Sequence, residues 1–209
     1  MVKEDIVIVL PRELRRLMLT WAQACKEETG GALVGYRLTH KDGRKLWMLR
    51  TFLPPGPSAS HSPASFAQGG LYQAALLSLL RKTEQWPAKG GWKTSKATFL
   101  GDWHSHPSFS AKPSAGDKQT VKSLLEEEPS LPGFVVLIAA NGQSSSWSLG
   151  AHLALRQEEK VVWQEGTVIE PEALGLDEVM NSLEPWPSPS RLHRMVRKIQ
   201  ERRRHVCEH

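Results

Sequence analysis

The sequence predicts an α/β protein built on a mixed β-sheet that helices cover on both faces. Three observations support this prediction. Short apolar runs of strand length alternate along the chain with segments whose apolar residues recur at helical spacing. Asp42-Gly43, which lies between two strand-like runs, is a strong signal for a β-hairpin turn. The chain has 209 residues, 40% of them hydrophobic, which suffices for one well-buried domain and an appendage.

The first half of the chain begins with an apolar run at residues 6–10, which we expect to be an edge strand. A helix is expected over residues 11–26, because a proline suits its first turn and apolar residues then recur every three or four positions. Gly30-Gly31 ends this helix, and residues 32–38 and 45–52 form the strands of the hairpin. The apolar helix positions are Leu14, Leu17, Met18, Trp21, Ala22 and Cys25.

Residues 53–63 contain Pro and Gly at a density that cannot continue a strand, so we expect a surface loop there. A second helix is expected from Phe66 to about Glu84. Its buried stripe would consist of Leu71, Ala74, Ala75, Leu76, Leu79 and Leu80.

The second half of the chain combines four expected strands with one helix. The strands are expected at residues 97–103, 134–140, 147–155 and 161–169. The helix is expected over residues 114–128, with Ser114 as its N-cap.

The excess positive charge of the chain is concentrated at its C-terminus. Residues 188–209 hold seven Lys or Arg and two Asp or Glu, and this difference of five equals the formal net charge of +5. A Pro-rich, stiff linker at 185–189 precedes an expected basic amphipathic helix. We therefore divide the chain into a main domain (1–175) and a tail (176–209). The first 187 residues are neutral in sum, so the high pI of the chain is no argument that the main domain binds nucleic acid.

Three interpretations of the basic tail stay open. Its apolar stripe can dock on the body or on a partner, its arginines can contact an acidic partner or a polynucleotide, or His205, Cys207 and His209 can bind a metal. No apolar run approaches the roughly 18 residues that cross a membrane, and the first residues lack the layout of a signal peptide. Two cysteines are few for a secreted scaffold, so we expect a cytoplasmic protein with free thiols.

Two histidines and a carboxylate in the middle of the chain predict a metal site. His104 and His106 are two residues apart on an expected strand, so their imidazoles point to the same side. Pro107 stops the strand, and the following helix brings Asp117 back to the same place. Three protein ligands leave a fourth position open for water, which is typical of catalytic zinc. Ser114-x-x-Asp117 is also a helix capping box, and the two interpretations are compatible.

The spacing His-x-His-Pro-x6-Ser-x2-Asp, with an upstream Glu-x-x-Gly-x-Leu-x-Gly, resembles the JAMM (MPN+) metallopeptidase family. These segments are residues 104–117 and 28–35. The motif Gly56-Pro57-Ser58-Ala59, with Ser62 and Phe66, and the run from Gly101 to His104 resemble the prokaryotic JAB branch. The resemblance implies the MPN/JAB fold, which is cytidine-deaminase-like.

The resemblance also implies a role for each matching residue. His104, His106 and Asp117 would bind one Zn²⁺ per chain, Glu28 would be the general base, and Ser114 would stabilise the oxyanion. Glu27 is adjacent to Glu28, and the spacing to the glycines that follow selects Glu28.

Similar proteins cleave peptide or isopeptide bonds at the C-terminus of ubiquitin-like proteins, and some accompany modifier-activating and conjugating enzymes in bacterial antiphage operons. The insertion at 54–69 would form the substrate groove, with an ordinary variable loop as the alternative. Candidate substrate contacts are Pro54, Gly56, Pro57, Ser58, Phe66 and Trp103. Two other functions stay open: a non-catalytic scaffold of the same fold, and a nucleic-acid-associated protein of the RadC type.

Overall fold

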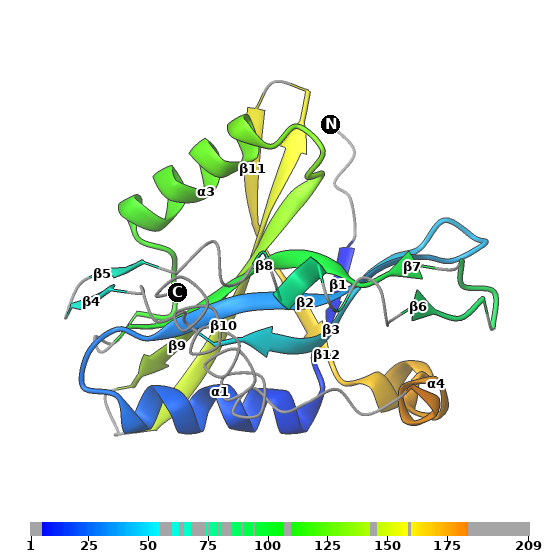
Figure 1. Cartoon of the computed structure of the whole chain (residues 1–209), viewed down its shortest axis with the longest axis horizontal. Helices are drawn as coiled ribbons and strands as arrows, with labels where there is room; N and C mark the ends of the chain where they lie inside the picture. The colour runs from blue at the N-terminus through cyan, green and yellow to red at the C-terminus, as the bar shows by residue number, and fades with distance from the viewer. Residues whose placement is uncertain are drawn as a thin grey trace, which may run out of the picture.

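A computed structural model shows one eight-stranded mixed sheet with helices on both of its faces (Figure 1). It describes residues 6–54, 60–62, 65–67, 74, 76–78, 80, 85–88, 90–93, 95–106, 110–142, 146–158 and 160–183. The strands follow the order β11-β10-β9-β8-β2-β3-β1-β12. Their bounds are β1 Ile6–Val9, β2 Gly30–Thr39, β3 Lys45–Leu53, β8 Thr98–His106, β9 Gly133–Asn141, β10 Trp147–Gln157, β11 Lys160–Glu165 and β12 Thr167–Ile169. The predicted fold class is confirmed.

Strand β8, which carries both histidines, lies in the middle of this sheet. It pairs antiparallel with β2 and parallel with β9, and α3 (Ala115–Glu127) connects β8 to β9. The predicted β2–β3 hairpin is confirmed, and Gly43 in its turn has a φ of 91°, which favours glycine. Gly30 and Gly31 were expected to end the first helix and to precede the strand. They are instead the first two residues of β2.

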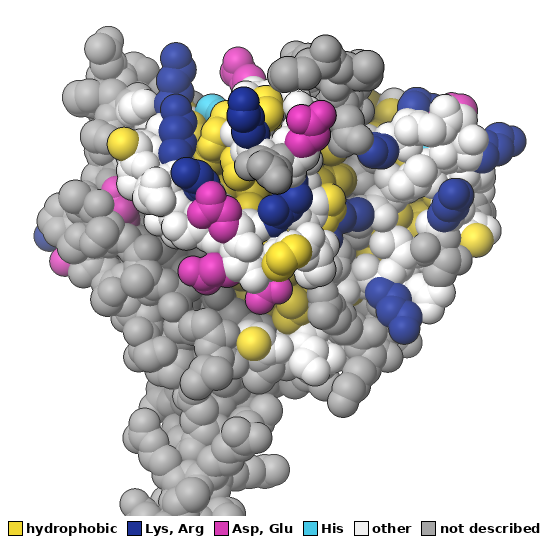
Figure 2. All heavy atoms as spheres, turned by 90° about the horizontal axis from the view of Figure 1, so that it is seen from above, with side chains coloured by type: hydrophobic (Ala, Val, Ile, Leu, Met, Phe, Trp, Pro, Cys, Tyr) yellow, Lys and Arg dark blue, Asp and Glu magenta, His cyan; other side chains and the backbone are white. Residues whose placement is uncertain are grey.

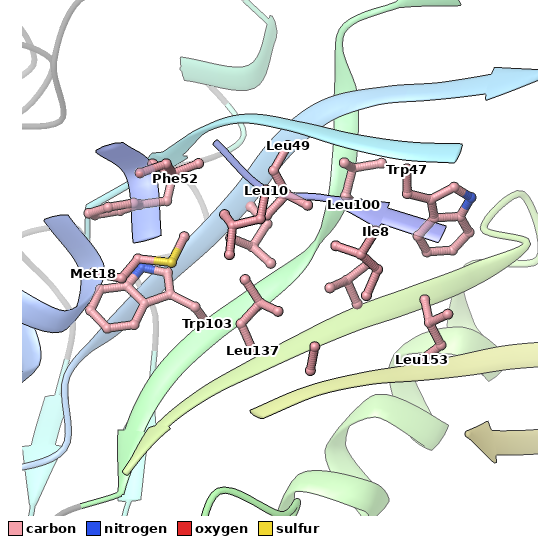
Figure 3. Packing of buried hydrophobic residues seen from close by; sticks show 14 of the residues in the cluster. Ile8, Leu10, Met18, Trp47, Leu49, Phe52, Leu100, Trp103, Leu137 and Leu153 are labelled. Carbon is pink, nitrogen blue, oxygen red and sulfur yellow. The ribbon is translucent and has the colours of Figure 1, made fainter. Parts of the chain in front are cut away.

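Helices α1 (Arg12–Ala24) and α3 pack on opposite faces of the sheet. The buried side of α1 is formed by Leu14, Met18 and Ala22, and Met18 lies near Phe52 and Trp103 in the core (Figure 3). The buried side of α3 is formed by Val121 and Leu125. Cys25 was expected on the buried side of the first helix, but it is exposed one residue beyond the end of α1.

The sheet curls so strongly that its two edges meet, and this corrects two predictions. Residues 161–169 were expected as one strand, but Gly166 divides them into β11 and β12. These two strands lie at opposite ends of the strand order. Because β11 ends at Glu165 and β12 begins at Thr167, the chain crosses from one edge of the sheet to the other at Gly166. The Gly166 N–H donates to the Ala151 carbonyl at 2.8 Å. Because β12 pairs with the outer side of β1, β1 is an interior strand and not the expected edge.

The segment expected as the second helix is only partly helical. Phe66 lies in strand β5 (Ser65–Ala67), which pairs with β4 (Ser60–Ser62), so the helix does not begin there. Residues 74, 76–78 and 80 are helical. Leu76 and Leu80 are buried as predicted, whereas Ala74 is exposed.

Six short elements were not predicted. Strand β4 lies within residues 53–63, where a loop was expected, and it pairs with β5. The others are the paired strands β6 (Gln85–Trp86) and β7 (Ser95–Lys96), the 3-10 helix η1 (Pro171–Leu174), and α4 (Asp177–Ser182). Leu176 and Val179 from the last of these segments pack against β2 and β3. The expected linker at 185–189 and the basic tail helix lie outside the described residues.

Charged side chains of both signs share the face of the molecule seen in Figure 2, with hydrophobic side chains between them. This face therefore carries a mixed charge, in agreement with the near neutrality of the first 187 residues. Within the part of the chain that the structure describes, no helix is long and apolar enough to cross a membrane.

Candidate metal centre

The period of strand β8 places the two histidines on the same side of the sheet. His104 and His106 point towards the face that α3 covers, while Trp103 and Ser105, which alternate with them along the strand, point the other way. Both imidazoles are almost fully buried, with 6% and 7% of their surface exposed. Neutral donors that converge in a buried place are suited to binding a cation.

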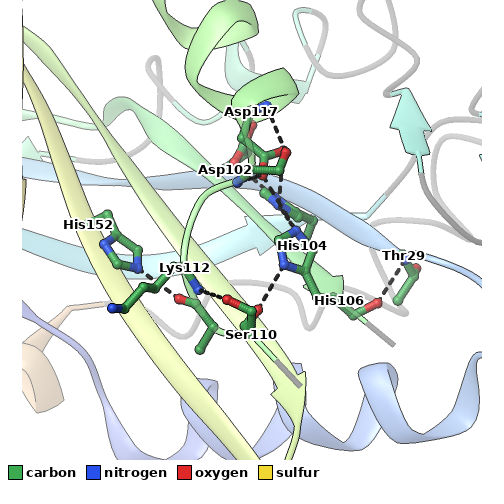
Figure 4. A network of polar contacts seen from close by, with 11 residues as sticks. Thr29, Asp102, His104, His106, Ser110, Lys112, Asp117 and His152 are labelled. Carbon is green, nitrogen blue, oxygen red and sulfur yellow. Dashed lines mark hydrogen bonds and ion pairs between the residues drawn. The ribbon is translucent and has the colours of Figure 1, made fainter. Parts of the chain in front are cut away.

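Asp117 joins the histidines from the first turn of α3, and the three side chains face one another (Figure 4). His104 Nε2 lies 3.1 Å from His106 Nε2 and 3.3 Å from Asp117 Oδ1. His106 Nε2 lies 3.5 Å from Asp117 Oδ2. The predicted triad is therefore brought together, and it is the one group of potential metal ligands found among the described residues.

These separations fit a tetrahedral metal ion. Zinc bound at about 2.0–2.1 Å would hold neighbouring ligand atoms about 3.3–3.4 Å apart, and the three observed separations are 3.1, 3.3 and 3.5 Å. Two imidazoles and one carboxylate also form the donor set of three-ligand zinc sites. The residues present therefore fit the expected ion.

The second ring nitrogen of each histidine faces an acceptor. His106 Nδ1 donates to the Ser110 carbonyl at 2.9 Å, and because a carbonyl only accepts, the proton must be on Nδ1. His106 Nε2 then keeps its lone pair for a metal when the ring is neutral. His104 Nδ1 lies 3.6 Å from Asp102 Oδ1, a contact that is longer than a hydrogen bond. This buried Asp102 oxygen has no hydrogen-bond partner among the described residues.

A capping box fixes the position of Asp117. The Asp117 N–H donates to Ser114 Oγ at 3.1 Å, and the Ser114 N–H donates to Asp117 Oδ2 at 2.6 Å. The helix cap and the ligand interpretations of this segment are therefore both consistent with the structure. The cap orients the carboxylate that faces the histidines.

Backbone pairing with β8 places Glu28 beside the histidines. The Ser105 N–H donates to the Thr29 carbonyl at 2.7 Å, and the Thr29 N–H donates to Ser105 Oγ at 3.0 Å. Because Gly30 pairs with His104, this register puts Glu28 opposite His106 and on the same side of the sheet. Glu28 is half-buried there, whereas Glu27 is exposed.

The electrostatics of the site favour a cation between the three ligands. Burial would lower the pKa of His104, but the carboxylates of Asp102 and Asp117 outweigh it and raise this pKa to about 10. Burial would raise the pKa of Asp117, but its contacts with both histidines hold the pKa well below its usual range. Protons thus occupy the site where a metal ion can bind.

The pKa of Glu28 is raised, whereas that of Asp117 is lowered. Burial raises the pKa of the Glu28 carboxyl, and the nearby histidines oppose this increase. A carboxylate of raised pKa can accept a proton more readily, which is what a general base requires.

The expected substrate contacts have different outcomes. Trp103 is fully buried in the core, where its ring lies 5.1 Å from that of Phe52, so its prediction as a substrate contact is wrong. Pro54 is also buried, directly after β3. Gly56, Pro57 and Ser58 lie outside the described residues, and Phe66 is described only as part of strand β5.

Three positions around the triad were missed by the sequence analysis. Asp102 could have been found, because it precedes His104 by two residues and therefore shares its side of the strand. The carbonyl groups of Ser110 and Ala111 carry no such signal. The latter accepts from His152 Nε2 at 2.8 Å, and His152 is distant in the sequence.

The chain is similar to known proteins in sequence and in fold. The solution structure of protein DSY2949 from Desulfitobacterium hafniense is similar, with a TM-score of 0.51 and 25% sequence identity. The similarity covers 78% of this chain and 94% of that one. No curated protein matches the chain. Residues 11–150, about two thirds of the chain, match the family described as prokaryotic homologs of the JAB domain, and the chain therefore belongs to this family.

Proposed function

We propose that this protein is a zinc-dependent peptidase or isopeptidase that cleaves after the C-terminal glycine of a ubiquitin-like protein. The observation that carries the proposal is the convergence of His104, His106 and Asp117, with Glu28 on the same side of the sheet. The family includes peptidases as well as non-catalytic members. A complete set of potential ligands together with the half-buried carboxylate of Glu28 favours the catalytic alternative.

The three ligands would hold zinc with one position open. A zinc ion bound there supplies Lewis-acid chemistry, which makes water nucleophilic near neutral pH by lowering its pKa to about 7. Glu28 takes a proton from the attacking water at a carboxylate oxygen and delivers it to the nitrogen of the leaving amine. Breaking the amide bond thus leaves a free carboxylate on the modifier and an amine on the other product.

Ser114 would stabilise the negative charge that develops on the substrate carbonyl oxygen. Its Oγ accepts from the Asp117 N–H, so the helix cap uses an oxygen lone pair and leaves the hydroxyl proton available. The side chain is exposed, which gives a substrate access to it. A single donor of this kind contributes about 3–4 kcal/mol to the transition state in other enzymes.

The substrate would bind as an extended strand beside the metal centre. Residues 54–69 include the β4–β5 hairpin, and hairpin edges can pair with an extended peptide. The narrow, glycine-rich C-terminus of a ubiquitin-like protein suits this kind of binding. The proposal extends to a cytoplasmic location and to a bacterial operon that encodes the modifier with its activating and conjugating enzymes.

The test compares Glu28→Gln with the matched control Glu27→Gln in the full-length protein. The substrate is a ubiquitin-like domain fused through its C-terminal glycine to a reporter, and zinc content is measured in each variant. We expect wild type and Glu27→Gln to cleave the fusion, and Glu28→Gln to retain zinc but lose about 10²–10⁴-fold in kcat.

A chelator should abolish the cleavage, and added zinc should restore it. Folded wild-type protein that binds no zinc would overturn the metal centre. Equal activity of Glu28→Gln and wild type would overturn the role of the base.

A further inference from the structure

Residues 110–112, which lie between β8 and α3, approach strand β10, where His152 contacts Ala111 and Gly150 leaves room for it. His152 Nε2 lies 2.8 Å from the Ala111 carbonyl oxygen (Figure 4). Two residues earlier on the same strand, Gly150 has no side chain, and a Cβ there would lie 2.2 Å from the same oxygen. The close approach of the Ala111 carbonyl to β10 therefore requires glycine at 150 and a donor at 152.

The peptide group next to this contact orients a metal ligand. The Ser110 carbonyl, adjacent to that of Ala111, accepts the Nδ1–H of His106 at 2.9 Å. The Lys112 N–H donates to Ser110 Oγ at 3.3 Å, which closes a tight turn over residues 110–112. Because the turn is compact, the position of the Ala111 carbonyl also determines that of the Ser110 carbonyl.

The hydrogen bonds have a defined direction. Carbonyl groups only accept, so His152 donates from Nε2 and His106 donates from Nδ1. His106 is thereby kept in the tautomer whose Nε2 lone pair faces His104 and Asp117. If the Ser110 carbonyl were displaced, the His106 ring could rotate, and its proton could lie on either ring nitrogen.

We propose that His152 is a positioning residue for the metal centre, which acts through the turn at 110–112 to fix the ring and tautomer of His106. Gly150 shares this role, because its lack of a side chain admits the turn. The proposal rests on the proposed metal site and adds two residues of β10 to it. Neither residue touches the metal or the substrate.

Four variants of the full-length protein test this inference. His152→Ala removes the donor, His152→Gln keeps an N–H donor of similar reach, and Gly150→Ala displaces the turn. Ser148→Ala is the matched control, since Ser148 is an exposed residue of the same strand. Zinc affinity is measured by competition with a chromophoric chelator, and the ligand geometry by the visible absorption of the cobalt-substituted protein.

We expect His152→Ala and Gly150→Ala to bind zinc about 10–100-fold more weakly, as is usual for residues that support metal ligands. Their cobalt spectra should change, while His152→Gln and Ser148→Ala should resemble wild type in both measurements. Wild-type affinity and an unchanged spectrum in both His152→Ala and Gly150→Ala would overturn the proposal. If His152→Ala fails to fold, Gly150→Ala alone decides: weaker zinc binding supports the proposal, and wild-type affinity with an unchanged spectrum overturns it.

A second measurement separates this inference from the proposed function. Two-bond ¹H–¹⁵N spectra of metal-free protein, recorded at a pH where the His106 ring is neutral, report which of its ring nitrogens carries the proton. We expect Nδ1–H in wild type and in His152→Gln, and a mixture of tautomers in His152→Ala. The inference can therefore hold in a protein that fails to cleave any modifier, and it is overturned if His152→Ala leaves the His106 tautomer unchanged.

Discussion

Glu27 and Glu28 are neighbours in the chain, yet they meet different surroundings. The two hydrogen bonds between Thr29 and Ser105 fix the register of this segment, so Glu28 lies on the side of the histidines and Glu27 is exposed to solvent. The chemical difference between two identical side chains is therefore decided by pairing with a strand about 75 residues away, as the Thr29–Ser105 separation of 76 shows.

The raised pKa of Glu28 predicts the acid limb of the pH–rate profile. Burial raises this pKa above the ordinary value of 4.5, and a base acts only when it is deprotonated. As the pH falls through the raised pKa, Glu28 gains a proton, so kcat/KM should fall at a higher pH than an ordinary glutamate would cause. A pH profile of fusion cleavage measures this limb. An acid limb that stays at the ordinary pKa of glutamate would contradict the prediction.

At the level of elements, β8 is shaped by a glycine where it contacts β9. Gly101 has a φ of 154°, and a Cβ at this position would lie 1.9 Å from the Val135 carbonyl oxygen. The pairing with β2 is irregular beside it, between Leu33 and Val34. This glycine lies three residues before His104, so the close approach of β8 and β9 helps to set the position of the first metal ligand.

Gly101→Ala should destabilise the fold by about 1–3 kcal/mol, because the added methyl group meets fixed backbone and the φ is unfavourable for alanine. Gly116→Ala is the control. A Cβ there meets only Ser114 Oγ, at 3.6 Å, and alanine favours the helix by up to about 1 kcal/mol. Urea unfolding measures the free energy of unfolding of each variant and of wild type. Equal stability of Gly101→Ala and wild type would show that the strands can separate at no cost.

At the scale of the whole molecule, the metal centre joins segments that are far apart in the chain. The segment around Glu28, strand β8, the start of α3 and the turn held by β10 all meet there. The three ligand atoms are acceptors that lie close together in a buried place, so the folded chain without a metal ion needs protons to offset their repulsion. Metal binding should therefore be linked to the stability of the entire domain.

Zinc should raise the free energy of unfolding by about 2.7 kcal/mol when its free concentration is 100 times Kd. For a chain of this size this corresponds to about 2–4 °C in Tm for each kcal/mol. Asp117→Asn should lose the response, whereas Glu126→Gln, an exposed carboxylate on the same helix, should keep it. Thermal unfolding with and without a chelator measures the effect, and a zinc response that persists in Asp117→Asn would place the metal elsewhere.

The fold class, the β2–β3 hairpin, the group of potential metal ligands and the cap of α3 could all be predicted from the sequence. Each of these depends on residues close together in the chain: a two-residue turn, a period of two on β8, and a cap followed three residues later by Asp117. Such local patterns fix which side chains share a side of a strand or begin a helix, because short-range geometry allows few alternatives.

Which distant segments lie against one another could be learned only from the folded structure. The division of residues 161–169 at Gly166 and the interior position of β1 depend on the curl of the sheet, and Trp103 is buried on the face that α1 covers. The contact of His152 with the turn beyond β8 spans 41 residues. Local periodicity cannot predict these features, because it specifies which residues lie together on one element and not which distant backbone will pair with it.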